Sequence, residues 1–366
     1  MRPESPVNVA LVHEFFCNLG GSDQVAAVLH RLYPEAPVFT LLVSDRNRDA
    51  ELLRSMDLRT SFVQRLPLAR RWHEPFLPFF PAAIESFDLS GYDLVLSSSH
   101  LCAKGVIPAP EALHLCYCYT PARYAWDLGP LYLRRLNPLV RIYAAAVLHR
   151  LRVWDVTASA RVDHIAAVSN FVARRIERYY RRRATVIYPP VDTTFFTPGE
   201  ETSDYWLVVS RLTAYKRVDL AVDAFTRLGL PLVVIGDGPE RRRLRRRAGS
   251  NVKFLGMVPR SQVRDAMRVC RGLIYPGKED FGITPVEVQA SGRPVVALGA
   301  GGAVETVVDG VTGVLFGEQT VEALCKAVAR CAVLSFDREA IRCHALQFDQ
   351  EVFCHKMLDF VQEKWE

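Results

Sequence analysis

Short apolar runs recur along this chain, separated by stretches in which apolar residues return every three or four positions. Such runs begin at Val7, Tyr92, Leu113, Trp206 and Leu232. Strands buried on both faces of a parallel sheet read as continuous apolar runs, whereas amphipathic helices show a period near 3.6 residues. The pattern therefore predicts an α/β protein in which strands and helices alternate.

A proline-rich segment interrupts this alternation near the middle of the chain. The segment runs from residue 186 to residue 200, and a fresh strand pattern begins at Trp206. A chain of 366 residues is long enough for two domains with separate cores. We predict two domains, residues 1–198 and residues 199–366, each built on a parallel sheet.

Residues 137–160 are predicted to form one long helix. A strand over residues 164–168 should follow, and Ser169 is placed to cap the next helix. That helix carries arginines at 174, 175 and 178 and is predicted to end in three more arginines at 181–183. This basic face is compatible with solvent or with anionic lipid, and both interpretations stay open.

Composition is that of a globular protein, with 49% hydrophobic and 23% charged residues. The formal charge of +6 favours attraction to phosphates or anionic lipid, and we predict no nucleic-acid partner because no known nucleic-acid motif accompanies the arginines. Residues 59–87 are rich in proline, aromatics and arginine. They could form part of the core or rest on a membrane surface.

Nine cysteines, an odd number without C-x-x-C spacing, indicate reduced thiols and a cytoplasmic location. Cys116 and Cys118 are spaced to share one face of a strand, which supplies too few ligands for a metal site. The N-terminus leads directly into a strand, and no stretch is apolar for about 18 residues. We therefore expect neither a signal peptide nor a membrane span.

The loop from Glu279 to Glu287 has the strongest chemical signal. Gly282 allows close approach of the backbone to a ligand, and the amides that open the next helix suit a phosphate. Glu279 and Glu287 can each accept hydrogen bonds from sugar hydroxyls. A phosphate-binding loop flanked by two such carboxylates suggests a nucleotide sugar as the ligand. Alternatively, Thr284 and Glu287 form a capping box with Pro285 at the first helical position, a compatible structural role.

Two further loops follow predicted strands. Gly20-Gly21, with Ser22 as the expected helix N-cap, would place amides beside a phosphate, or it is a simple tight turn. Arg211 and Lys216 would place two cations beside a diphosphate, or they lie on a solvated loop. The turn after Leu232 lacks a complete G-x-G-x-x-G motif because Arg241 replaces the third glycine, so an oxidoreductase is not favoured.

The Glu-x7-Glu spacing around Phe281-Gly282 resembles the signature of the retaining glycosyltransferases of family 4. That resemblance covers nearly the whole chain and implies the GT-B fold, with two Rossmann-like domains facing a central cleft. It implies that Glu279 binds the donor sugar and that Glu287 binds the ribose. Sugar and diphosphate would be bound by Phe281, Gly282, Ile283 and Thr284. The diphosphate would also contact Arg211 and Lys216, with Gly20-Gly21 facing it, and Pro259 would lie beside the base. The last helix is expected to return to the N-terminal domain.

A second motif runs from Tyr119 to Asp127, and it resembles a motif of bacterial mannosyltransferases that usually begins His-Thr-Pro. Tyr119 replaces the histidine, so it offers a neutral hydroxyl in place of a group that titrates near pH 7. We expect this hydroxyl to contact the donor sugar or the acceptor. Arg123, Trp126 and Asp127 form an acceptor shelf or, equally, a structural cluster.

The resemblance therefore implies retaining transfer of a hexose, with Glu279, Lys216, Arg211 and Tyr119 acting in catalysis. GDP-mannose is the favoured donor, a UDP-sugar is the alternative, and a catalytically weak nucleotide-sugar- or glycan-binding protein is a third reading. A glycan or polyprenyl-linked glycan is the expected acceptor, and an anionic membrane surface at the inner face of the membrane is a further candidate partner. No cofactor or metal is expected, because the cations and helix amides would neutralise the leaving diphosphate.

Overall fold

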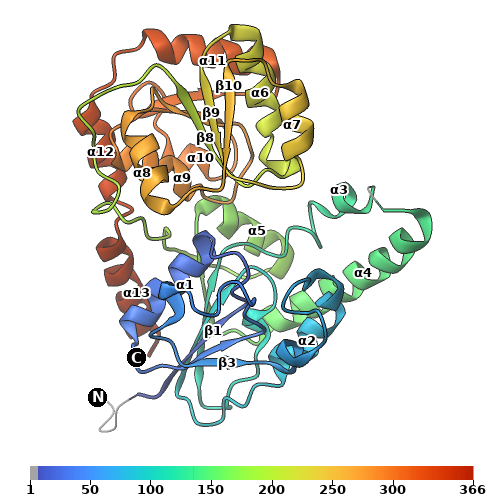
Figure 1. Ribbon diagram of the computed structural model, residues 1–366. Helices are drawn as coiled ribbons and strands as arrows, with labels where there is room; N and C mark the ends of the chain where they lie inside the picture. Colours follow the sequence, from blue (N-terminus) through green and yellow to red (C-terminus); the bar gives the residue numbers. More distant parts are fainter. Residues whose placement is uncertain (1–6, 135, 366) are drawn as a thin grey trace. The chain divides into compact units, whose positions relative to one another are not determined.

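The computed structural model describes residues 7–134 and 136–365. The chain divides into two compact units, Met1–Tyr188 together with Cys354–Glu366, and Pro189–Phe353. Each unit contains one sheet whose strands are all parallel (Figure 1), which confirms the predicted α/β class with two parallel sheets. The boundary expected at residue 198 lies inside the second unit, before its first strand.

The N-terminal unit has a seven-stranded sheet in the order β3-β2-β1-β4-β5-β6-β7. Its strands are β1 (Val9–His13), β2 (Val38–Thr40), β3 (Leu58–Thr60), β4 (Leu94–Ser99), β5 (Leu113–Cys118), β6 (His164–Ala167) and β7 (Thr185–Val186). Its helices are α1 (Gly21–Leu32), α2 (Phe80–Glu85), α3 (Gly129–Leu133), α4 (Pro138–Ala160) and α5 (Asn170–Tyr180), with short 3₁₀ turns η1 (Glu51–Leu53), η2 (Phe62–Arg65), η3 (Glu74–Phe79) and η4 (Ala103–Gly105).

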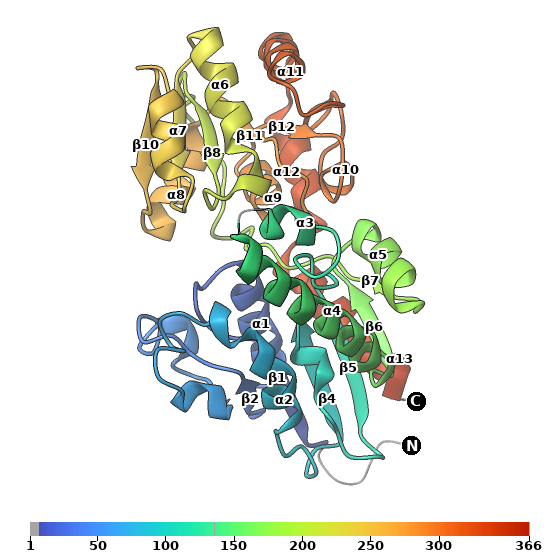
Figure 2. The ribbon, with the colours of Figure 1, turned by 90° about the vertical axis from the view of Figure 1, so that its right-hand side faces the viewer.

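Helices cover both faces of this sheet, as its continuous apolar strands require. One hydrophobic core joins residues of β1, β2 and β4 to residues of α2 and α4, including Phe80, Ile84, Leu148 and Leu151. Helix α1 lies on the side of the sheet opposite to α2 and α4 (Figures 1 and 2). Helix α13 (Gln350–Trp365) begins in the second unit, and from Cys354 onward it belongs to the first.

The C-terminal unit has a six-stranded sheet in the order β10-β9-β8-β11-β12-β13. Its strands are β8 (Trp206–Val209), β9 (Leu232–Ile235), β10 (Val252–Gly256), β11 (Leu273–Tyr275), β12 (Val295–Leu298) and β13 (Gly313–Phe316). Its helices are η5 (Ala214–Lys216), α6 (Val218–Leu228), α7 (Arg241–Arg247), α8 (Arg260–Val269), α9 (Ile283–Ala290), α10 (Ala303–Thr306), α11 (Val321–Val333) and α12 (Arg338–Leu346).

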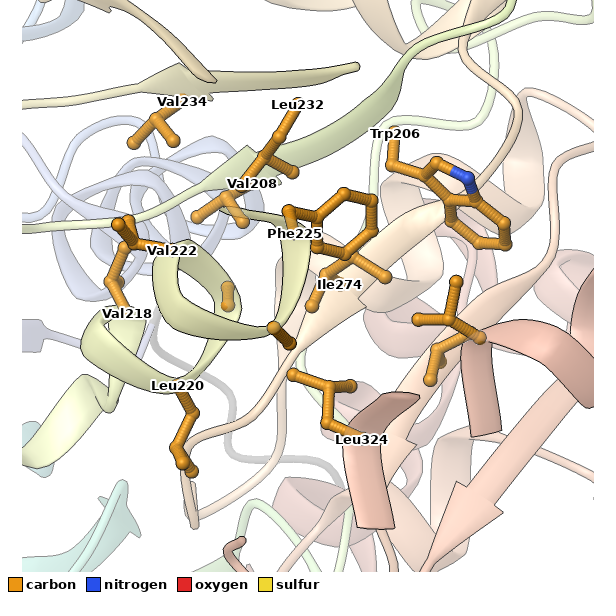
Figure 3. Packing of buried hydrophobic residues seen from close by; sticks show 14 of the residues in the cluster. Trp206, Val208, Val218, Leu220, Val222, Phe225, Leu232, Val234, Ile274 and Leu324 are labelled. Atoms are coloured by element: carbon orange, nitrogen blue, oxygen red, sulfur yellow. The ribbon is translucent and has the colours of Figure 1, made fainter. Parts of the chain in front are cut away.

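Helix α6 shows how the second core is built. Its apolar face, with Val218, Val222 and Phe225, packs on β8 and β9, and Phe225 meets Trp206 edge-on with ring centroids 6.1 Å apart (Figure 3). The helix ends where Gly229 adopts a left-handed conformation at φ 68°. Helices α7 and α11 contribute to the same core.

In both sheets the strand order reverses at the middle. Counted from the first strand of each unit, the C-terminal order is 3-2-1-4-5-6, the order of the Rossmann fold, and the N-terminal sheet adds a seventh strand. Ligands of such sheets bind outside the carboxyl ends of the two strands at the reversal. We therefore expect ligand-binding residues on the loops after β8 and β11 in the C-terminal unit, and on the loops after β1 and β4 in the N-terminal unit.

The segment from α4 to α5 has most of its predicted structure. The long helix, the following strand and the Ser169 cap are confirmed, since Ser169 Oγ accepts a hydrogen bond from the Val172 amide. Helix α5 ends at Tyr180, before the three arginines, because Arg181 turns left-handed at φ 57°. Arg175 is buried, so it is not part of the exposed basic face that was predicted for this helix.

The aromatic and basic segment 59–87 contains both buried and exposed side chains. Phe80 is buried in the core and Phe76 packs against it. Trp72 and Phe79 are both exposed. Part of the segment therefore serves packing, and part of it is surface.

Candidate functional site

Lys216 and Glu279 meet at the strand-order reversal of the C-terminal unit. Lys216 ends the 3₁₀ turn η5 after β8, Glu279 follows β11, and Lys216 Nζ lies 2.8 Å from Glu279 Oε2. Their loops pack so closely that a side chain at Gly277 would come within 3.0 Å of the Lys216 carbonyl oxygen. The fold therefore joins a cation and a carboxylate that are 63 positions apart in the sequence (279 − 216).

The second oxygen of Glu279 has no hydrogen-bond partner among the residues that the structure describes. Glu279 is buried, and its Oε1 receives no hydrogen bond from any residue that the structure describes. A buried carboxylate oxygen without a donor is costly, so such an atom calls for an explanation such as a ligand hydroxyl.

The glycine loop after β12 holds Glu279 in place by backbone contacts. Gly302 donates its amide to the Glu279 carbonyl at 2.9 Å. A Cβ at Gly301, where φ is 74°, would lie 2.2 Å from that same carbonyl oxygen. Glycine is thus required for close packing of this loop on the Glu279 loop.

Helix α9 begins at Ile283, two residues before Pro285, where the predicted capping box would start it. Its N-cap is Gly282, which adopts φ 102°, and no side-chain capping bond is found there among the described residues. The expected capping box of Thr284 and Glu287 is therefore wrong, and the helix amides are not taken up by Thr284. Phe281 is buried and packs edge-on against Phe348, with ring centroids 5.5 Å apart.

Glu287 lies one turn into α9, partly buried and without a hydrogen bond to its carboxylate from the described residues. Burial raises its pKa to about 7, with Arg260 opposing this shift and Asp192 adding to it. Arg260 itself pairs with Asp192 at 3.3 Å and stacks over Phe195. Glu287 therefore does not cap the helix, and its carboxylate oxygens can accept hydrogen bonds from a ligand.

The raised pKa of Glu287 predicts a pH-dependent effect on stability. A carboxyl group with a higher pKa in the folded state stabilises that state while protonated, and this contribution is lost as pH rises toward 7. We expect Glu287→Gln to stabilise the protein more at pH 8 than at pH 5, as measured by urea unfolding at both values. A difference in unfolding free energy that is the same at both pH values would contradict the assignment.

Two other predicted residues of this unit lie on surface loops. Arg211 follows β8, is exposed, and makes no ion pair or side-chain hydrogen bond within the described residues. Its neighbour Arg217, in contrast, is held by Asp219 at 3.1 Å. Pro259 is the exposed N-cap of α8. Arg211 is therefore a cation that remains available at the carboxyl end of β8.

In the N-terminal unit, Gly20 is the N-cap of α1 and Gly21 is its first residue. The Gly20 amide donates to Asp23 Oδ2 at 2.5 Å, and the other oxygen of Asp23 lies 3.2 Å from His13 Nε2. The predicted N-cap at Ser22 is therefore wrong: Ser22 is already helical, and the Asp23 carboxylate takes the capping role.

Tyr119 follows β5, and its hydroxyl is fixed by two contacts. It donates to the Ser22 carbonyl at 3.0 Å and lies 2.8 Å from Ser98 Oγ. Ser98 in turn lies 3.1 Å from His13 Nδ1. Burial raises the pKa of Tyr119 well above its ordinary value, so this side chain stays neutral at physiological pH.

Glu14 is a buried acidic residue at the strand-order reversal that the sequence analysis did not single out. Its carboxylate is fully buried and accepts hydrogen bonds from the Ser99 hydroxyl and from four consecutive backbone amides, those of residues 100–103, at 2.7–3.1 Å. A run of convergent amides of this kind is a typical anion nest. Glu14 therefore joins the loops after β1 and β4, the two loops at the strand-order reversal.

His100 lies on the loop that Glu14 holds. Its Nδ1 is buried without a partner among the described residues, and its ring stands edge-on to Phe15 with centroids 5.4 Å apart. Burial lowers the pKa of His100, which favours the neutral ring. The sequence signal was a histidine directly after a strand that ends in three serines.

The proposed acceptor shelf has partners inside its own unit. Asp127 accepts two hydrogen bonds from Arg175, at 2.7 and 2.9 Å, and lies 4.0 Å from Arg123. Trp126 donates to buried Asp155 at 2.8 Å and stacks on Tyr179 with ring centroids 4.5 Å apart. These contacts correspond to the structural alternative, and acceptor binding by this cluster stays a prediction.

Cys116 and Cys118 are buried in β5. Within the described residues, no group of three or more His, Cys, Asp or Glu side chains is placed to hold a metal ion.

Comparison with known proteins shows which family the second unit is similar to. Residues 192–340 match the family described as glycosyl transferases group 1. Over these residues the second unit is similar to group 1 glycosyltransferases. The matched stretch contains Arg211, Lys216, Pro259, Glu279 and Glu287, whereas the candidate residues of the N-terminal unit lie outside the match.

Two curated relatives support this conclusion. An uncharacterized glycosyltransferase of Methanocaldococcus jannaschii is 30% identical over 43% of this chain and 46% of its own length. The O-antigen chain mannosyltransferase C of Escherichia coli is 31% identical over 46% of this chain and 51% of its own length. The matches thus span about half of the length of these relatives.

Among solved structures, HepE from Anabaena in complex with UDP resembles the chain over its whole length. The TM-score is 0.74, and the match covers 98% of this chain and 100% of HepE at 17% identity. The fold is therefore that of GT-B glycosyltransferases, with two Rossmann-like domains. Across residues 7–134 and 136–365, no helix is both long and apolar enough to span a bilayer.

Proposed function

We propose that this protein transfers a hexose from a nucleoside diphosphate sugar to a glycan with retention of configuration. The observation that supports this proposal is the environment of Glu279. Its buried Oε1 receives no hydrogen bond from the described residues, while its Oε2 lies 2.8 Å from Lys216 Nζ. A carboxylate fixed on one side and open on the other can accept a hydrogen bond from a sugar hydroxyl.

Charge at the same edge of the sheet suits the leaving group. Lys216 and Arg211, which makes no ion pair within the described residues, would supply positive charge where the diphosphate develops negative charge, and the amides that open α9 would add to this field. These groups take the role that a divalent ion would have, so we propose a metal-independent reaction. Glu287, free of the helix cap, would hold the ribose diol.

Tyr119 does not serve as a base in this scheme, because burial keeps its hydroxyl protonated. The glycosidic C–O bond to the diphosphate breaks, the acceptor oxygen bonds to the same carbon from the same face, and the acceptor proton passes to a diphosphate oxygen. Retention then needs no side-chain base. In this scheme the Tyr119 hydroxyl and the His100 ring would form hydrogen bonds with sugar hydroxyls.

Mannose from GDP-mannose is the proposed donor. The Thr120-to-Asp127 motif and the similarity to O-antigen chain mannosyltransferase C favour it. A UDP-sugar is the alternative donor, because the structurally similar HepE was solved in complex with UDP. The proposed acceptor is a growing or polyprenyl-linked glycan.

Tyr119→Phe should reduce kcat/KM for the donor by roughly 10-fold, because one hydrogen bond to a sugar hydroxyl is lost in the transition state. Steady-state release of the nucleoside diphosphate measures this. Tyr205→Phe is the matched control, since Tyr205 donates to the Ala266 carbonyl in the other unit and is assigned no role. Equal kcat/KM for wild type and Tyr119→Phe would rule out the contact.

The proposed reaction is tested by following GDP-mannose with a mannoside acceptor series by proton NMR. An α-linked product, or α-mannose from slow donor hydrolysis, is expected. A β-linked product would reject retention. Donor binding without any transfer or hydrolysis would favour a binding protein over an enzyme.

A further inference from the structure

The beginning of helix α4 exposes several large apolar side chains. Leu139 is 82% exposed, Ile142 70% and Tyr143 64%, and residues 137–143 are exposed without interruption. Tyr132 on α3 is exposed as well. In Figure 1 this end of α4 and helix α3 extend away from the sheet of their own unit. We call Tyr132, Leu139, Ile142, Tyr143 and the exposed Val153 the α3–α4 apolar surface.

This surface is distinct from the face by which α4 packs. The buried residues of the helix are Leu148, Leu151, Asp155, Ala158 and Ser159. At 100° per residue, Leu139, Ile142, Tyr143 and Val153 lie on the opposite side. Helix α4 thus has one apolar face in the core and a second that no described residue covers, which is unusual for a surface helix.

The segment that carries this surface has charges of one sign. Between Leu128 and Trp154 the sequence holds no aspartate or glutamate and has five arginines, Arg134, Arg135, Arg141, Arg150 and Arg152. Arg134 and Arg150 are exposed. Apolar and aromatic side chains among arginines suit the interface of an anionic bilayer, where the rings and aliphatic groups enter the headgroup region and the arginines meet lipid phosphates.

We propose that the α3–α4 apolar surface docks this protein on an anionic phospholipid bilayer. A second copy of the chain fits less well, because two such surfaces would bring arginines of the same sign together with no acidic residue to pair with them. The helix would rest on the membrane and not cross it, consistent with the hydropathy of the described helices. This inference concerns a separate surface and does not depend on the proposed reaction.

Cosedimentation of the full chain with phosphatidylglycerol/phosphatidylcholine vesicles tests the docking. We expect binding to these vesicles, at least 10-fold weaker binding to pure phosphatidylcholine, and at least 10-fold weaker binding for the triple variant Leu139→Ser, Ile142→Ser, Tyr143→Ser. Arg134→Gln with Arg150→Gln should weaken binding to anionic vesicles only. Circular dichroism and thermal unfolding establish that the variants are folded.

Matched controls remove equally exposed groups elsewhere. Val333→Ser removes an apolar side chain that is 84% exposed on α11, and Arg242→Gln with Arg246→Gln removes exposed charge from α7. Both should bind as wild type does. Failure of wild type to bind anionic vesicles, or unchanged binding by the triple variant, would overturn the proposal. So would a wild-type dimer that the triple variant converts to a monomer without any vesicle binding.

Discussion

Replacing Lys216 by alanine is expected to lower kcat by about 100-fold or more, because the residue stabilises charge that develops on the leaving diphosphate. It also holds Oε2 of Glu279 at 2.8 Å, so its loss leaves a buried carboxylate without its cation. Because the contribution arises in the transition state, kcat and kcat/KM should fall together. Initial rates of nucleoside diphosphate release at several donor concentrations measure both.

Lys253→Ala provides the matched control for this substitution. Lys253 is an exposed lysine on β10 in the same unit, away from the β8 and β11 loops. Its removal should leave the rate unchanged. If folded Lys216→Ala turned over within a few-fold of wild type, the role given to the Lys216–Glu279 pair would be wrong.

Replacing Glu14 by alanine is expected to lower the free energy of unfolding by roughly 3–5 kcal/mol, because four buried amides and one hydroxyl lose their acceptor together. Urea unfolding of the full chain measures this change. Glu35→Ala, at an exposed glutamate, should change the value by no more than about 0.5 kcal/mol. Similar destabilisation by both substitutions would contradict the anchoring role.

Glu14 should also contribute to acid sensitivity. Burial raises its pKa, but the neighbouring His100 and the amides of Cys102 and Ala103 outweigh burial, so the pKa lies below its ordinary value of 4.5. The stabilisation is therefore complete above the unfolded-state pKa and is lost as pH falls through the folded-state value. Glu14→Gln should make stability less dependent on pH below about pH 5.

Much of the fold followed from local patterns. Continuous apolar runs such as residues 206–209 and 232–235 became buried parallel strands, and Ser169 capped its helix as predicted. The loops at β8 and β11 were placed correctly at strand ends, since strand and turn signals are local.

The details that depend on distant neighbours could not be predicted in this way. Thr284 does not cap α9 because Gly282 turns left-handed as the N-cap, and the helix starts at Ile283, two residues before the expected position. The requirement for Gly301 appears only when its loop meets the Glu279 carbonyl. Glu14 looks like any loop glutamate until β1 and β4 are paired and the amides of residues 100–103 converge on it.

The central claim is that the edge of the sheet around Lys216 and Glu279 binds the diphosphate of a nucleotide sugar. It is tested most directly by thermal unfolding of the purified protein with GDP, UDP, ADP and GDP-mannose. A ligand at about 100 times its dissociation constant stabilises by about 2.7 kcal/mol, which gives a clear rise in Tm. We predict stabilisation by GDP and GDP-mannose that Lys216→Ala diminishes. Selective stabilisation by UDP or ADP would replace the donor and keep the site, whereas no shift with any nucleotide would contradict the account.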